Sequence, residues 1–180
     1  YVAADLLSQA EHDPNAGSVL ITDSLHLAEA VDAALERRLS ATRHRDRAST
    51  ALSGPQSGTV LVRDLEQAIE VADAYAAEHL EIHTAEAPEV ARRIRNAGAI
   101  FVGPHSPVPL GDYLAGSNHV LPTGGTARFA AGLSVMAFLK PVQLIEYSAG
   151  ALEALTPALE VLATCEDLPA HGEAARARRK

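Results

Sequence analysis

The stretch TVLVRDLEQAIEVADAYAAEHLEIH, residues 59–83, decides the fold because it reads as strand, helix and strand in succession. Thr59 to Val62 is a short apolar run, which indicates a buried strand. Asp64 is placed to cap a helix that we expect to run to about Ala77. His79 to His83 is short and strand-like again. This order predicts a βαβ unit with parallel strands.

The same alternation continues on both sides of this stretch. Apolar residues at helical or strand spacing predict the other elements of the α/β part. They are a helix at Val2–Glu11, a strand at Ser18–Thr22, a helix capped by Ser24 and ending near Leu39, a helical patch at Arg43–Leu52, a helix from Pro88 through Arg95, and a strand at Ala99–Val102. We therefore predict an α/β fold with a mainly parallel sheet, part of a Rossmann-like domain.

The chain changes character at Gly103. Residues 103–132 are rich in glycine and proline but keep polar residues among apolar ones, which is typical of an ordered site loop. An extended segment at Pro141–Tyr147 and helices at Ala149–Cys165 and Ala170–Arg179 should follow. We expect residues 1–140 to be the α/β domain that carries the site, and residues 141–180 to be a helical arm.

Composition limits the classes of function. The 180 residues are 47% hydrophobic with a formal charge of −8, which indicates a soluble globular protein and argues against nucleic acid as a partner. No apolar run is long enough to span a membrane. The single cysteine fits a reducing compartment, and we expect a cytoplasmic protein. Tyr1 already lies within a predicted helix, so we expect residues upstream of it.

Four places hold side chains suited to metal or acid–base chemistry. Taken singly, each has an ordinary explanation as a surface pair, a cap or a turn, and Gln-x-x-His spacing on a helix is common by chance. Zinc accepts imidazole nitrogen and carboxylate or amide oxygen in open sites, so the residues together suggest an open metal site without establishing one. The four places are Gln9 with His12, Glu78 with His79, Asp112 followed by His119, and Glu166 with His171.

Two other chemistries find little support in the sequence. Aldehyde-oxidising enzymes can use a cysteine nucleophile, and Cys165 is followed by a carboxylate, but an isolated cysteine in an apolar helix is usually a small buried hydrophobe. Neither of the glycine-rich phosphate-binding motifs is present. The nearest approach is Gly124-Gly125-Thr126, which does not lie between a strand and a helix.

Three runs resemble the histidinol dehydrogenase family in the same order. They are LLSQAEHDP at 6–14, AEHLEI at 77–82 and GDYLAGSNHVLPTGGTARF at 111–129, and the ending from Glu166 to His171 matches as well. The resemblance covers essentially the whole chain. It implies oxidation of L-histidinol to L-histidine through an aldehyde, with two hydride transfers to NAD, as the last step of histidine biosynthesis.

The resemblance also implies a role for each matching residue. Glu78 and His79 would be the acid–base pair. The zinc ligands, which also contact substrate, would be Gln9, His12, Asp112 and His171. Glu166 would contact substrate, as would His79, and His119 should lie nearby. Because the family completes its site across a homodimer, Glu166 and His171 would serve the partner's site.

The resemblance implies that the main NAD contacts lie upstream of Tyr1, so this chain alone should be inactive. Two alternatives remain open from the residues. One is a zinc hydrolase in which Glu78 activates water, which would need no upstream part. The other is a non-catalytic binding or dimerisation module whose polar residues are structural.

Overall fold

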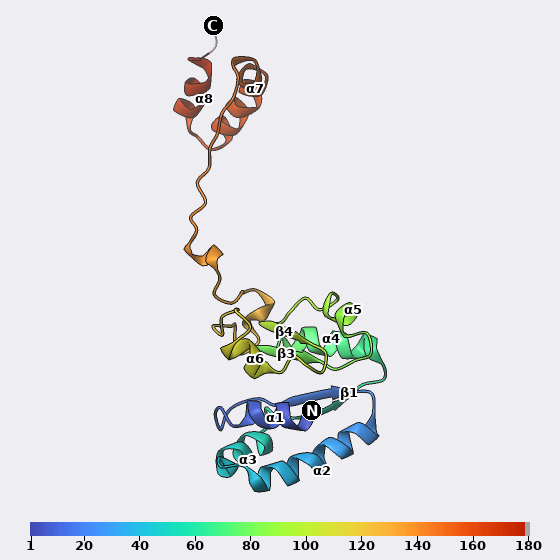
Figure 1. Cartoon of the computed structure of the whole chain (residues 1–180). Coiled ribbons are helices and arrows are strands. Elements are labelled where there is room, and N and C mark those ends of the chain that lie inside the picture. Colours follow the sequence, from blue (N-terminus) through green and yellow to red (C-terminus); the bar gives the residue numbers. More distant parts are fainter. Residues whose placement is uncertain (179–180) are drawn as a thin grey trace. The chain divides into compact units, whose positions relative to one another are not determined.

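The computed structural model describes residues 1–178, and the chain divides into one unit at Tyr1–Phe138 and a second from Leu139 onward. In the first unit, strands alternate with helices as the sequence predicts (Figure 1). The elements in chain order are α1 (Val2–Ala10), β1 (Val19–Thr22), α2 (Leu25–Ala41), α3 (Arg45–Ser53), β2 (Gly58–Leu61), α4 (Leu65–Tyr75), β3 (His79–Ile82), α5 (Ala87–Ala91), β4 (Ala99–Val102) and α6 (Val108–Tyr113).

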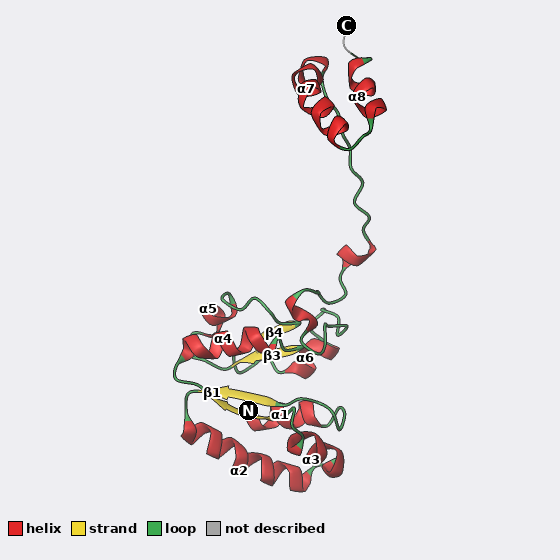
Figure 2. Cartoon of the chain, turned by 180° about the vertical axis from the view of Figure 1, so that it is seen from behind, coloured by secondary structure: helices red, strands yellow, loops and turns green. Residues whose placement is uncertain are grey.

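The strands form two separate parallel pairs. β1 pairs with β2, with Val19 opposite Gly58, and β3 pairs with β4, with His79 opposite Ala99. Helices α1, α2 and α3 lie around the first pair, and α4, α5 and α6 lie around the second (Figure 2). The prediction of parallel βα units is confirmed. The four described strands are not joined into one sheet, because no ladder of hydrogen bonds connects the β1–β2 pair with the β3–β4 pair.

Small apolar side chains make the cores. Leu20 of β1 packs with Ala3 and Val31, which joins α1 and α2 to the first strand pair. A second cluster joins α4 and α5 to β3 through Ile69, Ile82, Ala87 and Val90. A third holds α1 against α3 through Ala10, Ala48 and Ala51, each fully buried. The small alanine side chains let α1 and α3 approach each other closely, and this close packing fixes the position of the C-terminal end of α1.

Two predicted helix caps are confirmed. The Ser24 hydroxyl accepts a hydrogen bond from the Leu27 N–H at 3.2 Å, and the Asp64 carboxylate accepts one from the Gln67 N–H at 2.9 Å. At the other end of α4, Ala76 adopts the left-handed conformation with φ +55°. This conformation ends the helix and turns the chain into β3.

The glycine-rich segment contains more structure than the sequence predicts. It includes α6 and a 3-10 turn at Thr126–Arg128, and a second 3-10 turn follows at Val135–Phe138. Pro109 lies in the first turn of α6. The backbone N–H groups of a first turn have no partner within the helix, so a proline is tolerated there and is compatible with the start of a helix. By contrast, α5 is shorter than predicted and stops at Ala91, before Arg95.

The second unit contains α7 (Ala149–Cys165) and α8 (Pro169–Arg176), which pack against each other. α7 has the predicted bounds, and the Ser148 hydroxyl caps it by accepting a hydrogen bond from the Ala151 N–H at 3.2 Å. Arg176 of α8 binds Glu160 of α7 at 3.2 Å. The predicted end of the last helix, Arg179, lies outside the described residues. Across residues 1–178, no helix has the length and apolarity to cross a membrane.

Candidate metal and acid–base site

The turn between α4 and β3 presents Glu78 and His79. After Ala76 ends the helix, the Glu78 carbonyl accepts a hydrogen bond from the Ala99 N–H at 2.9 Å, which fixes this turn to the start of β4. Gly98 makes that approach possible, because a Cβ on Gly98 would lie 2.5 Å from the Glu78 carbonyl oxygen. The backbone therefore holds the predicted acid–base pair in a defined place.

The His79 imidazole is buried and has no hydrogen-bond partner. Its side chain is 13% exposed, and neither ring nitrogen has a partner among the described residues. Nε2 lies 3.8 Å from Oδ1 of Asp112, and the ring lies against Phe101 with 6.0 Å between ring centroids. Buried polar atoms without partners are uncommon and often mark a functional group. Both ring nitrogens are therefore available to contact a bound molecule.

Asp112 lies near His79 because Gly111 packs closely on Phe101. A Cβ at Gly111 would lie 2.6 Å from the Phe101 ring, so only glycine allows α6 this close to β4. Gly111 is buried, and Asp112 beside it is partly buried. The glycine therefore brings together two residues that are 33 positions apart in the sequence.

His12 and Asp112 line one pocket of about 350 Å³ at the end of α1. Arg47 of α3 also lines it and donates a hydrogen bond to the Glu11 carbonyl at 3.1 Å, next to His12. His44, another lining residue, lies 3.5 Å from Arg47. The sequence analysis missed Arg47 and His44, because nothing in the charged run 43–47 distinguishes a pocket side chain from a solvated one.

Gln9, Glu78 and His79 line a different, larger cavity of about 940 Å³. All residues of β1 and of β3 line this cavity, whereas within the described residues none of β2 or β4 does. Side chains on a strand alternate between the two faces of a sheet, so a cavity that touches every residue of a strand lies along the edge of that strand. We call the edge of β1 away from β2 and the edge of β3 away from β4 the inner edges, and these two edges border the cavity. Gly124 and Gly125, both with positive φ, form part of its wall.

The structure thus places the predicted site residues of the first unit in two neighbouring spaces. Gln9 belongs to the larger cavity and His12 with Asp112 to the smaller pocket, while the His79–Asp112 contact connects the two. His119 is exposed in the segment after α6.

Glu166 and His171 belong to the second unit. Glu166 caps the C-terminus of α7, with its N–H donating to the Leu162 carbonyl at 3.0 Å, and His171 lies in the first turn of α8. Both are exposed. Cys165 is exposed as well, so the expectation that it is a buried hydrophobe is wrong. It lies at the last position of α7.

The fold and these residues define an α/β protein with a candidate metal and acid–base site. The sequence model of histidinol dehydrogenase matches residues 1–179. The chain belongs to the histidinol dehydrogenase family, which confirms the resemblance found from the sequence.

Individual relatives are similar over almost the whole chain. Histidinol dehydrogenase of Corynebacterium efficiens is 64% identical over 177 residues, covering 98% of this chain and 39% of the relative. That of Mycobacterium tuberculosis is 61% identical over 178 residues, covering 99% and 40%. The crystal structure of histidinol dehydrogenase from Elizabethkingia anophelis superposes with a TM-score of 0.92 at 33% identity, covering 98% and 40%. The chain therefore spans about two fifths of the length of these relatives.

Proposed function

We propose that this chain carries the metal and acid–base residues of an enzyme that oxidises L-histidinol to L-histidine, through histidinaldehyde, with zinc and NAD. The observation that carries the proposal is the His79 imidazole, whose buried ring nitrogens have no hydrogen-bond partner among residues 1–178 and whose Nε2 lies 3.8 Å from Asp112. An imidazole in this position is suited to accept the hydroxyl proton of an alcohol.

The donor set is suited to zinc. Gln9, His12, Asp112 and His171 would supply amide oxygen, imidazole nitrogen and carboxylate oxygen, and His12 and Asp112 line the same pocket. Zinc, when bound, would hold the imidazole and amine of histidinol and so orient its hydroxymethyl carbon. NAD, when bound, would accept the two hydrides, since zinc is redox-silent. We expect the NAD contacts outside these 180 residues.

The chain's own residues would move the protons. His79 would take the hydroxyl proton of the alcohol through a ring nitrogen. Glu78, its neighbour on the wall of the same cavity, would take a proton from the water that hydrates the aldehyde. Glu166 would contact the substrate. No cysteine nucleophile is needed in this sequence of steps.

The second unit would complete the site of a partner subunit in a homodimer. Glu166 and His171 are both exposed on this unit, as is expected of residues that contact another subunit. In this proposal the enzyme works in the cytoplasm, as a small-molecule biosynthetic enzyme.

The test compares the 180-residue chain with the same chain joined to the upstream part of the Corynebacterium efficiens relative. We expect histidinol-dependent NADH formation, followed by absorbance, from the joined protein and none from the chain alone. The joined His79→Asn protein is the matched control for catalysis by this chain. NADH formation by the chain alone, or a fully active His79→Asn protein, would contradict the proposal. Hydrolytic release of product without NAD would favour the hydrolase alternative.

A further inference from the structure

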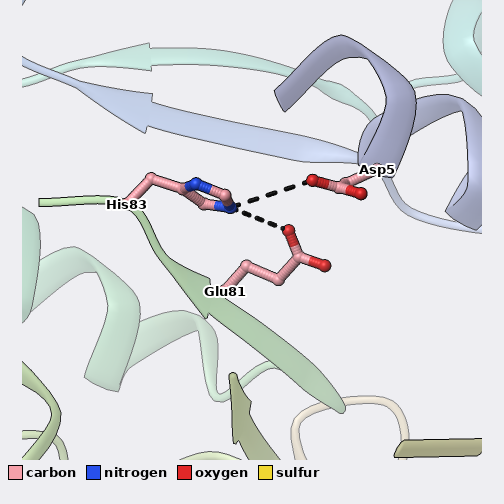
Figure 3. A group of neighbouring side chains, drawn as sticks. All are labelled: Asp5, Glu81 and His83. Carbon is pink, nitrogen blue, oxygen red and sulfur yellow. Dashed lines mark hydrogen bonds and ion pairs between the residues drawn. The ribbon is translucent and has the colours of Figure 1, made fainter. Parts of the chain in front are cut away.

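Asp5, Glu81 and His83 form a cluster that the proposed function does not use (Figure 3). We propose that this cluster is a second divalent-cation site, selective for a transition metal such as Zn²⁺ and separate from His12 and Asp112. The inference stands independently of the proposed function, because it needs neither histidinol nor NAD.

The geometry supports coordination by three side chains. One ligand atom from each residue lies within 4.8 Å of the other two. Nε2 of His83 is 3.1 Å from Oε2 of Glu81 and 3.8 Å from Oδ2 of Asp5. Asp5 comes from α1, whereas Glu81 and His83 come from β3 and the residue after it (Figure 3). An ion here would therefore bridge parts of the chain that are 76 positions apart.

The Asp5 and Glu81 carboxylates are partly buried, and His83 is at the exposed side of the cluster. The Asp5, Glu81 and His83 side chains are 20%, 14% and 23% exposed and line the larger cavity. Oε1 of Glu81 accepts a hydrogen bond from the Val108 N–H at 3.0 Å, which leaves Oε2 directed at His83. One carboxylate oxygen is thus used for positioning and the other remains available as a ligand.

The charge of the cluster is not balanced by the protein. Within residues 1–178, neither carboxylate forms an ion pair with lysine or arginine. Burial, and then the neighbouring Glu81 carboxylate, raise the pKa of Asp5 to about 6. Two partly buried carboxylates without a lysine or arginine partner hold negative charge that a divalent ion would neutralise.

The chemistry of the donors selects the class of ion. One imidazole nitrogen and two carboxylate oxygens leave a tetrahedral ion one open position, which water can fill. Calcium and magnesium prefer all-oxygen sites with six or more ligands, which the three side chains do not provide. The mixed set therefore favours zinc or a similar first-row ion.

The experiment is a calorimetric titration of the 180-residue chain with ZnCl₂ at pH 7.5. The background protein carries His12→Ala and Asp112→Asn, which removes two of the four ligands proposed for the other metal site. We expect this background to bind about one ion per chain. Adding His83→Gln should weaken binding by at least about tenfold, as the loss of a ligand does. Adding His26→Gln, a change at an exposed histidine of α2, should leave binding unchanged.

Asp5→Asn in the same background separates loss of the site from loss of the fold. It should weaken zinc binding yet unfold at the same or a higher temperature without metal, because it removes carboxylate repulsion. A background protein that binds no zinc, or a His83→Gln protein that binds it as tightly as the background does, would overturn the inference. Either result would leave the proposed function untouched, since that function depends on His12 and Asp112.

Discussion

At the scale of single residues, the informative feature is a histidine whose surroundings do not satisfy it. His79 is surrounded by Phe101 and Asp112, and neither ring nitrogen has a hydrogen bond within the described part of the chain. Burying an imidazole without partners costs free energy. That cost is understandable if a bound alcohol supplies the missing partner.

Replacing His79 tests this directly in the joined protein. His79→Asn should lower kcat for NADH formation by about 10²–10⁴-fold, the range for removal of a general acid–base group, and change KM much less. The unfolding temperature should stay near that of the unchanged protein, because the ring makes no hydrogen bond that would be lost. His105→Gln, at an exposed position, is the control and should keep full activity.

Asp5 should make the stability of the chain depend on pH. Its pKa rises from 3.8 to about 6 on folding, so the folded state binds the proton more tightly than the unfolded state does. The contribution of this group to stability is therefore present at low pH and lost as the pH rises from 3.8 to about 6.

The Asp5→Asn variant checks the sign of that dependence. With EDTA present, the variant should be more stable than the unchanged chain at pH 7.5, by about 1 kcal/mol after allowance for solvent screening. The difference should shrink by pH 4.5. Urea unfolding at both pH values measures it, and a variant that is less stable at pH 7.5 would contradict the assigned cause.

At the scale of elements, local signals in the sequence predicted the strands and helices well. Ser24 and Asp64 mark helix starts by capping chemistry, and three of the four described strands lie in short apolar runs, so neighbouring residues decide these elements. α6 was not predicted, because proline and glycine indicate a loop unless a tertiary contact holds the helix. That contact is Gly111 against Phe101, which no local pattern reveals.

The candidate site shows the same difference between local sequence signals and long-range contacts. Glu78, His79 and Asp112 were identified through motif resemblance, while their closeness depends on Gly98 and Gly111, whose roles appear only when strands and helices pack. The pocket residues Arg47 and His44 carried no signal of their own. Long-range packing therefore accounts for what sequence reasoning did not find.

Gly98→Ala should disturb the turn that presents Glu78. The new Cβ would lie 2.5 Å from the Glu78 carbonyl oxygen, and backbone cannot move aside cheaply. We expect a loss of about 1–3 kcal/mol in unfolding free energy, together with reduced activity in the joined protein. Gly150→Ala is the control, because no atom lies within 4 Å of its Cβ, and it should be neutral or stabilising by up to about 1 kcal/mol. Equal stability of the two variants, measured by urea unfolding, would contradict this account.

At the scale of the whole molecule, the chain supplies about two fifths of its relatives' length and two units of different character. The second unit exposes large apolar side chains in the segment before α7, including Val142, Leu144 and Ile145 at 79%, 93% and 79%. Apolar surface of this extent on so small a unit marks an interaction surface. Such exposure fits an arm that binds another subunit.

Deleting residues 139–180 from the joined protein should therefore abolish dimer formation. We expect a dimer for the unchanged joined protein and a monomer for the truncated one by sedimentation velocity, with activity lost at the same time because Glu166 and His171 are removed. A matched control replaces only Arg178, near the end of α8, with Ala and should stay dimeric. A truncated protein that remains a fully stable dimer would show that the arm is not the interface.

Among residues 1–178, no strand pairs with the inner edges of β1 and β3, and this has a practical consequence for the isolated chain. Each offers a row of free backbone donors and acceptors, and such rows recruit any extended peptide that comes near. Concentrated solutions of the 180-residue chain should accordingly form β-rich aggregates that bind amyloid dyes. Co-expression with the upstream part of the relative should suppress this aggregation and raise the yield of soluble protein.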